Sequence, residues 1–224
     1  MRLRHGRRSA RAIALVCMAL ATVLASLTTG TATAEGPASD RAGAIVAAAR
    51  AQPPTPRVDI WQTLRSGTGY AVLLRHALAP GTGDPPGFRL GDCSTQRNLS
   101  AEGRRQAIAI GAQWRRERMP VQRVLTSRWC RARDTARLLA IGKVTAYPAL
   151  DSSFTVSNSV AQRRAARVRE LIGRHRDERG VLVLVGHQVN ITDLTGAVPA
   201  SGQAIVVKAR PDGSLRVVGA LPPP

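Results

Sequence analysis

The chain has 224 residues, of which 33 are Lys or Arg and 14 are Asp or Glu, so its formal charge is +19. Its hydrophobic fraction of 44% is ordinary for a packed core and excludes a largely disordered chain. Only Lys143 and Lys208 are lysines, so the positive charge is almost entirely arginine. With 3% aromatic residues there is no stacking platform for single-stranded nucleic acid, and we expect no nucleic-acid partner. The length suits one domain with at most an appendage.

Residues 1–34 have the pattern of a signal peptide. Met1 to Arg11 holds five arginines and no acid, residues 12–27 are apolar or small, and the segment ends in Ala32-Thr33-Ala34. We predict cleavage after Ala34, export to the periplasm or out of the cell, and no stable membrane insertion afterwards. Removing the five arginines lowers the formal charge from +19 to +14. Retention as a membrane anchor and export by a twin-arginine route stay open.

The cysteine count depends on this cleavage. Cys17 leaves with the signal peptide, and Cys93 and Cys130 remain. In an oxidising compartment an even pair predicts a disulfide, whereas two unrelated thiols are the alternative. A bond between residues 37 positions apart would stabilise the fold by roughly 3–4 kcal/mol in the chain-entropy model.

The first elements alternate between helix and strand. Residues 35–66 form an arm rich in Ala and Pro that ends in a short helix over 59–64. The apolar run 70–75 predicts a buried strand, and the Gly- and Pro-rich stretch 77–98 predicts a long loop. Ser100 is placed to cap a helix that reaches about residue 118.

The rest of the chain continues this alternation to its end. The predicted elements are a strand over 123–126, a helix over 127–141 capped by Ser127, a strand over 144–147, a helix over 159–174, a strand over 181–185, a helical turn over 192–196, and a hairpin over 204–208 and 214–218. Strands alternating with helices predict an α/β fold, a three-layer sandwich whose mainly parallel sheet has helices on both faces. We assign this domain to residues 67–224.

Several cationic side chains fall where strands end. Arg75 and His76 close the first strand, and His187 follows the strand over 181–185. Arg131 lies in the helix after the second strand. Ligands of such sheets gather at the carboxyl ends of strands. The alternative for either histidine alone is a core residue bound to a backbone carbonyl. His175 lies at an Arg-rich helix end, where we expect a solvent-exposed residue.

Together these groups favour phosphate chemistry. Two imidazoles and two guanidiniums at one sheet end need an anion to balance them. Arginine presents a planar fork that suits phosphate oxygens, and a helix starting at Ser127 would add amide donors. A neutral imidazole can act as a nucleophile. The pattern predicts a phosphoryl-transfer site without a metal or cofactor, since we see no cluster with metal-ligand spacing.

Four ordered motifs resemble the histidine phosphatase superfamily, also called phosphoglycerate-mutase-like. Leu73-Leu74-Arg75-His76 is similar to its Arg-His signature, and Arg97-Asn-Leu-Ser-Ala-Glu-Gly103 to its R-x-L-[ST]-x2-G helix start. Ser127-Arg-Trp-Cys-Arg-Ala-Arg-Asp-Thr-Ala136 resembles its S-x3-R-A-x2-T-A element, and Val185-Gly186-His187 its second histidine. The resemblance covers about residues 70–218.

The resemblance implies a role for each matching position. His76 would be the nucleophile that becomes phosphohistidine. Arg75, Arg131 and His187 would hold the phosphate and stabilise charge on its oxygens. Two positions depart from the family pattern, because Ala77 replaces the usual Gly and Gln188 stands where the acid-phosphatase branch has its Asp proton donor.

The proton donor therefore has two candidates of equal weight. Asp92 lies in the loop after the first strand and beside Cys93, and Asp151 follows the third strand, near where the mutase-like branch places its Glu. A turn or cap residue is the alternative for each.

The most favoured function is an exported phosphomonoesterase that acts on a phosphorylated small molecule or phosphosugar. Small exported family members resemble the lipopolysaccharide core heptose-phosphate phosphatases, which suggests the substrate by analogy. A phosphohistidine-protein phosphatase, a mutase, and a non-catalytic anion-binding protein on the same scaffold are the alternatives. The oligomeric state stays open.

Overall fold

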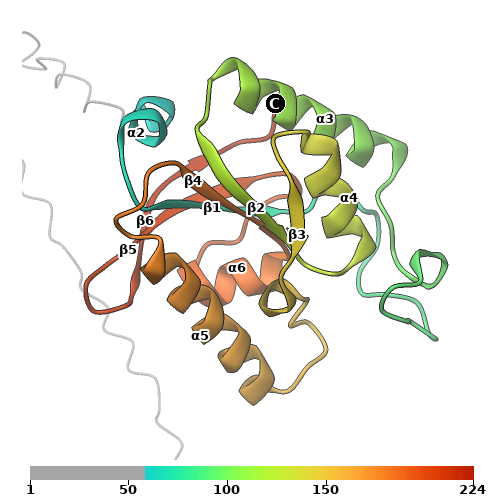
Figure 1. The fold of residues 1–224 in the computed structure, drawn as a ribbon. Coiled ribbons are helices and arrows are strands. Elements are labelled where there is room, and N and C mark those ends of the chain that lie inside the picture. The colour runs from blue at the N-terminus through green and yellow to red at the C-terminus, as the bar shows by residue number, and fades with distance from the viewer. Residues whose placement is uncertain (1–58) are drawn as a thin grey trace, which may run out of the picture. The chain divides into compact units, whose positions relative to one another are not determined.

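The computed structural model describes residues 59–224, which lie within one compact unit, and its elements follow the predicted order (Figure 1). The helices are α2 (Ile60–Ser66), α3 (Ala101–Arg116), α4 (Cys130–Leu139), α5 (Asn158–Arg174) and α6 (Gln188–Thr195), with short 3₁₀ helices η1 (Cys93–Thr95) and η2 (Pro148–Leu150). The strands are β1 (Tyr70–Arg75), β2 (Val121–Thr126), β3 (Val144–Ala146), β4 (Val181–Gly186), β5 (Ala204–Ala209) and β6 (Leu215–Leu221).

One six-stranded sheet with the order β3-β2-β4-β1-β5-β6 organises the domain. The pairs β2–β3, β2–β4 and β1–β4 are parallel, whereas β5 and β6 form the predicted hairpin and join antiparallel to β1. Strands β1 and β4 are neighbours at the centre, and their register pairs Arg75 with Gly186. Because both strands end at this pair, the residues that follow them emerge side by side.

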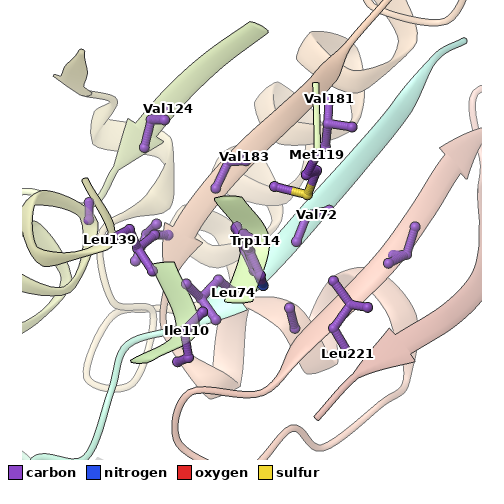
Figure 2. Packing of buried hydrophobic residues seen from close by; sticks show 14 of the residues in the cluster. Val72, Leu74, Ile110, Trp114, Met119, Val124, Leu139, Val181, Val183 and Leu221 are labelled. Carbon is purple, nitrogen blue, oxygen red and sulfur yellow. The ribbon is translucent and has the colours of Figure 1, made fainter. Parts of the chain in front are cut away.

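Two hydrophobic clusters occupy the two faces of the sheet. Side chains alternate along each strand, so Val72 and Leu74 join one cluster while Ala71 and Leu73 join the other. The first cluster lies under α2, α3 and α4, with Trp114 packed close to Leu74 (Figure 2). The second cluster lies under α5 and α6. These are the three layers of the expected α/β sandwich, which the fold confirms.

Helix α2 is part of the packed domain. Asp59 accepts hydrogen bonds from the amides of Trp61 and Gln62 and so caps the helix. Leu64 is fully buried in the first core cluster, and Ile60 and Trp61 pack against that cluster. The packed domain thus includes this helix, upstream of the start at residue 67 that we assigned from the sequence.

The start of α4 and the exposure of His175 differ from the sequence predictions, and α6 begins at Gln188, four residues before the predicted helical turn over 192–196. Helix α4 begins at Cys130 and not at Ser127, because the chain stays extended at Trp129, which takes the N-cap position. His175 is buried, with 6% of its surface exposed, and its Nε2 lies 3.0 Å from the carbonyl oxygen of Gly180. It closes the turn between α5 and β4, a role that its Arg-rich neighbours conceal.

The proposed signal peptide and the arm up to residue 58 lie outside the described residues, and so does Cys17. Across residues 59–224, no helix combines the length and the apolar character needed to span a membrane.

Candidate active site

Two buried histidines meet at the carboxyl end of the central strands. His76 follows β1 and His187 follows β4, and only 2% and 4% of their surfaces are exposed. Their ring centroids are 5.4 Å apart in an edge-to-face arrangement. The parallel register of β1 and β4 produces this meeting, as the positions of the two residues in the sequence predict.

The imidazole of His76 is held in one orientation. Its Nδ1 lies 2.8 Å from the carbonyl oxygen of Ala77. Because a carbonyl oxygen can only accept, Nδ1 carries the proton and Nε2 keeps its lone pair. Burial, followed by the positive charges of Arg131, Arg97 and Arg75, lowers the pKa of His76 to about 3, although the Ala77 hydrogen bond opposes this. At neutral pH the ring is an uncharged base.

The backbone after His76 is anchored to two helices. The Ala77 amide donates to Oγ1 of Thr135 on α4 at 3.0 Å, and the Leu78 amide donates to Oε1 of Gln106 on α3 at 2.9 Å. Gly103 lies against the Leu78 carbonyl so closely that a Cβ there would clash with it. The motif residues Gly103 and Thr135 therefore position the segment that holds His76.

His187 contacts a buried serine from the neighbouring strand end. Its Nε2 lies 2.9 Å from Oγ of Ser127, which follows β2 and is itself fully buried. Burial, followed by repulsion from the charge that a protonated His76 would carry and from nearby arginines, holds the pKa of His187 well below its ordinary value. Helix α6 begins at the next residue, so its first amides and the positive end of its dipole face the same region.

Three arginines line the cavity beside these histidines. Arg131 is almost completely buried, and Arg75 donates from Nη1 to the Pro199 carbonyl oxygen at 2.9 Å. Over residues 59–224, the Nε atoms of Arg75 and Arg131 are buried without a hydrogen-bond partner. Arg97 is the third arginine. Its backbone amide donates to the carboxylate of Asp84, and its guanidinium donates to the carbonyl oxygens of Gly83 and Ala79, so Arg97 fixes the loop after β1. The sequence reasoning gave Arg97 no role in the site.

Asp84 is a further residue that the sequence reasoning missed. Its carboxylate accepts from Nη1 of Arg131 at 2.7 Å, from Nη2 of Arg131 at 3.2 Å, and from Nε1 of Trp129 at 3.0 Å. Burial raises the pKa of Asp84, but the hydrogen bonds from Arg131 and Trp129 outweigh burial and leave that pKa lowered. The available signal was its place as the first acid after the strand that carries His76.

The two predicted proton donors are placed elsewhere. Asp92 caps η1 and pairs with the exposed Arg89, while hydrogen bonds from Ser94 and then Arg89 lower its pKa to about 2. Asp151 is fully buried and binds the guanidinium of Arg128 at 2.6 Å. Neither carboxylate lines the cavity that contains His76.

Three amides around the start of α4 are already engaged within the chain. The amides of Arg128, Trp129 and Cys130 donate to Asp151 at 2.9 Å, to Ser127 at 3.2 Å and to Gln96 at 2.9 Å. These three amides are therefore occupied, so this end of α4 offers an anion fewer amide donors than the sequence predicts. The guanidinium of Arg131 in the first turn of α4 is the side-chain contribution of this helix.

One cavity of about 290 Å³ unites these groups. It is lined by Arg75, His76, Gly81, Thr82, Gly83, Asp84, Phe88, Arg97, Trp129, Arg131, Ser152, Phe154, Thr155, His187, Gln188 and Val189. Asp84 is the single carboxylate among these lining residues. In residues 59–224 there is no group of three or more His, Cys, Asp or Glu side chains placed to hold a metal ion.

The predicted disulfide joins Cys93 and Cys130, whose Cα atoms are 5.7 Å apart. It ties the long loop between β1 and α3, which lies beside α4 in Figure 1, to the first residue of that helix. The bond is therefore next to Arg131 in sequence and belongs to the framework of the site.

Comparisons with known proteins agree with this architecture. Residues 71–152 match the family model of the histidine phosphatase superfamily (branch 1). No curated protein matches the chain. The solved structure of the protein histidine phosphatase SixA complexed with tungstate is similar, with a TM-score of 0.51 and 14% identity over 69% of this chain and 97% of that chain.

Two mycobacterial structures are similar to the same extent. The product of open reading frame Rv3214 from Mycobacterium tuberculosis has a TM-score of 0.51 and 16% identity, covering 69% of this chain and 97% of that chain. The mycobacterial glucosyl-3-phosphoglycerate phosphatase Rv2419c complexed with VO3 has a TM-score of 0.50 and 18% identity, covering 66% of this chain and 96% of that chain. At these identities the likeness establishes the fold.

The sheet order, the layers and the paired histidines define an α/β sandwich of the histidine phosphatase type. The matched segment carries His76, Arg97 and Arg131 and is similar to the histidine phosphatase superfamily (branch 1).

Proposed function

We propose that this protein is an exported phosphomonoesterase that works through a phosphohistidine at His76. One observation carries the proposal. A neutral, buried His76 with a free Nε2 shares a cavity with the guanidiniums of Arg75 and Arg131, whose Nε–H groups are buried without partners within residues 59–224. Such N–H groups are costly to leave unsatisfied, and phosphate oxygens are acceptors that match the arginine fork.

The first chemical step is attack by Nε2 of His76 on phosphorus. The N–P bond forms, the bond from phosphorus to the ester oxygen breaks, and its electron pair goes to the leaving oxygen. The carbonyl of Ala77 stabilises the positive charge that develops on the ring, because it accepts from Nδ1–H. Arg75, Arg131 and the start of α6 stabilise the negative charge on the phosphoryl oxygens.

We assign the proton for the leaving oxygen to Asp84 and no longer to Asp92 or Asp151. Asp84 lines the cavity, and its carboxylate occupies the Arg131 fork that a phosphate would take. A bound phosphate competes for that fork and brings a second negative charge close to the carboxylate. Both effects raise the pKa of Asp84 in the complex, so that it takes up a proton and can pass it to the leaving alkoxide.

Hydrolysis of the phosphohistidine completes the cycle. Asp84 accepts a proton from the attacking water, the N–P bond breaks, and its electron pair returns to Nε2 of His76. The products are the alcohol and inorganic phosphate, and the sum consumes one water. No redox or group-carrying cofactor enters this balance.

Export and the kind of substrate are finer parts of the proposal. The disulfide supports an oxidising compartment, in agreement with the signal-like pattern of residues 1–34. The cavity of about 290 Å³ is at the lower end of the size range of small-molecule sites, which favours a small phosphomonoester. A phosphosugar, as in the heptose-phosphate phosphatases, rests on sequence resemblance alone.

The test is the phosphoenzyme. After brief incubation with a 32P-labelled phosphomonoester and alkaline quench, we expect an acid-labile label on the chain that peptide mapping assigns to His76. His76→Ala should abolish both label and turnover while keeping the thermal unfolding transition, and Asp92→Asn should behave as the unaltered protein. Turnover above a few per cent in folded His76→Ala contradicts the mechanism. Phosphate binding without label or turnover would instead indicate the non-catalytic alternative.

A further inference from the structure

Both phenylalanines of this chain line the candidate active site. The chain contains three tryptophans, two tyrosines and two phenylalanines. Phe88, Phe154 and Trp129 border the cavity that holds His76. The other four aromatic residues pack in or against the two core clusters, and they are Trp61, Tyr70, Trp114 and Tyr147. The aromatic side chains are thus divided between the core and this cavity.

The three aromatic residues of the cavity come from separate segments. Phe88 belongs to the loop between β1 and α3, Trp129 precedes α4, and Phe154 lies between η2 and α5. Phe88 stacks on Trp129 with ring centroids 5.0 Å apart and an interplanar angle of 20°. Trp129 in turn meets His187 edge-on at 5.7 Å. We call Phe88, Trp129 and Phe154 the aromatic rim.

The aromatic rim is more exposed than the phosphate end of the cavity, and within the rim Phe88 and Trp129 are half-buried. Phe154 has 59% of its surface exposed, whereas His76 has 2%. Neither phenylalanine belongs to a hydrophobic cluster of residues 59–224. A phenylalanine left in water forgoes about 1.5–3 kcal/mol of burial energy. The exposed Phe154, beside a cavity that the half-buried Phe88 also lines, therefore indicates a surface that a ligand covers.

We propose that the aromatic rim binds a planar ring carried by the alcohol part of the substrate, so that the preferred substrates are phosphomonoesters with an aromatic or heteroaromatic ring. This inference rests on the proposed function and names its substrate class. Offset stacking or edge contact between aromatic rings contributes about 0.5–1.5 kcal/mol beyond the burial of area. Small alkyl phosphates and simple sugar phosphates lack the planar face that gains this energy.

Matched substrates separate the ring from the reactivity of the ester. Adenosine 5′-monophosphate and ribose 5-phosphate release the same kind of primary alcohol, and so do benzyl phosphate and cyclohexylmethyl phosphate. We expect kcat/KM to be at least about tenfold higher for the aromatic member of each pair. In Phe154→Ala this preference should fall to about twofold or less, because the loss of kcat/KM falls mainly on the aromatic member of each pair.

Leu90→Ala is the matched control, because Leu90 is an apolar residue with 40% of its surface exposed that does not line the cavity. It should leave every preference unchanged. Equal kcat/KM within both pairs, or a preference that persists in Phe154→Ala and in Phe88→Ala, overturns the inference. A higher kcat/KM for sugar phosphates than for both aromatic esters also overturns it.

A binding measurement distinguishes failure of this inference from failure of the proposed function. Benzylphosphonate and methylphosphonate carry the same anion and cannot be hydrolysed. In calorimetric titrations of the full chain, the benzyl compound should bind about tenfold more tightly, and Phe154→Ala should remove the difference. Equal affinities overturn the inference and leave the phosphatase intact. If neither phosphonate binds at millimolar concentration, the phosphate site itself is contradicted, and the inference falls with it.

Discussion

At the residue scale, the ion pair between Asp84 and Arg131 distinguishes the site from the one that the sequence suggests. The fork of Arg131 is occupied by a carboxylate of the same chain, on the loop that follows His76. In the proposed mechanism the protonation of Asp84 would depend on the substrate, because a bound phosphate would remove the hydrogen bonds from Arg131 that keep the carboxylate charged.

We predict that Asp84→Asn selectively slows the cleavage of esters with poor leaving groups. General acid catalysis contributes about 10²–10⁴-fold, so kcat/KM for alkyl phosphates should fall at least about 100-fold. For 4-nitrophenyl phosphate, whose leaving group needs no proton, the fall should stay below about tenfold. The measurement is the dependence of log kcat/KM on leaving-group pKa. A uniform loss across the series would contradict the assignment, and Asp92→Asn should show no loss.

A second prediction concerns His76 and the pH dependence of stability. The pKa of His76 is lowered to about 3 by burial and by the neighbouring arginines, whereas the unfolded chain titrates near 6.5. Between these values the unfolded state binds a proton that the folded state does not, so this histidine destabilises the fold as pH falls below about 6.5. The loss approaches about 1.4 kcal/mol per pH unit.

The His76→Ala variant isolates this effect. Its free energy of unfolding, measured by denaturant titration between pH 7 and pH 4, should decrease less steeply than that of the unaltered protein. The difference between the two slopes should approach about 1.4 kcal/mol per pH unit, which corresponds to one bound proton. Parallel curves for the two proteins would mean that His76 is charged in the folded state, and its role as a neutral nucleophile would be lost.

At the scale of elements, the disulfide connects the loop between β1 and α3 to α4. That loop supplies Asp84 and Phe88, and α4 supplies Arg131. Two hydrogen bonds also hold the junction, from the Cys130 amide to Gln96 at 2.9 Å and from the Asn98 amide group to the Cys93 carbonyl at 2.6 Å. The covalent bond therefore acts on a junction that has other contacts.

We predict that replacing both Cys93 and Cys130 by Ser costs roughly 3–4 kcal/mol of stability without preventing folding. The Michaelis constant should rise several-fold, because the loop and Arg131 lose preorganisation, while the phosphoenzyme still forms. Unfolding titrations and initial rates measure the two effects. Mass spectrometry of unreduced peptides provides the control, since two freely alkylated cysteines would remove the disulfide from the account.

The elements that could be predicted from the sequence are those with a strong local pattern. The apolar runs of β1 and β4 gave their bounds to within a residue, and the ends of these strands located His76 and His187. The sequence predicted that Ser127 caps a helix, but its hydroxyl contacts His187 instead. The two residues follow different strands and are far apart in the sequence, so no local pattern reveals this contact. Asp84 was missed for a similar reason, since its loop has no periodicity and its partners lie 45 and 47 residues away.

At the scale of the whole molecule, the proposed export would determine which chain is recovered and whether the bond between Cys93 and Cys130 persists. We predict that the recovered exported chain begins at Glu35, because Ala32-Thr33-Ala34 fits the cleavage pattern of signal peptidases. Intact-mass measurement and N-terminal sequencing check this. Replacing Ala34 by a bulky residue should cause the longer form to accumulate. A full-length chain recovered from membranes would instead support a retained anchor.

The occupied fork of Arg131 also bears on how the catalytic cycle ends. Inorganic phosphate can hold Arg131 only while Asp84 is displaced, so the return of the carboxylate competes with the product. Because Asp84 must leave Arg131 before any phosphate compound can bind there, the free energy of the contact between Asp84 and Arg131 is subtracted from the binding of each such compound. For the substrate, contacts of the alcohol part can offset that loss, but free phosphate has no such contacts. In the proposed mechanism, the contact between Asp84 and Arg131 lowers the affinity for the phosphate group itself, and the contacts of the alcohol part distinguish the substrate from the product. This arrangement would weaken product inhibition where phosphate is abundant.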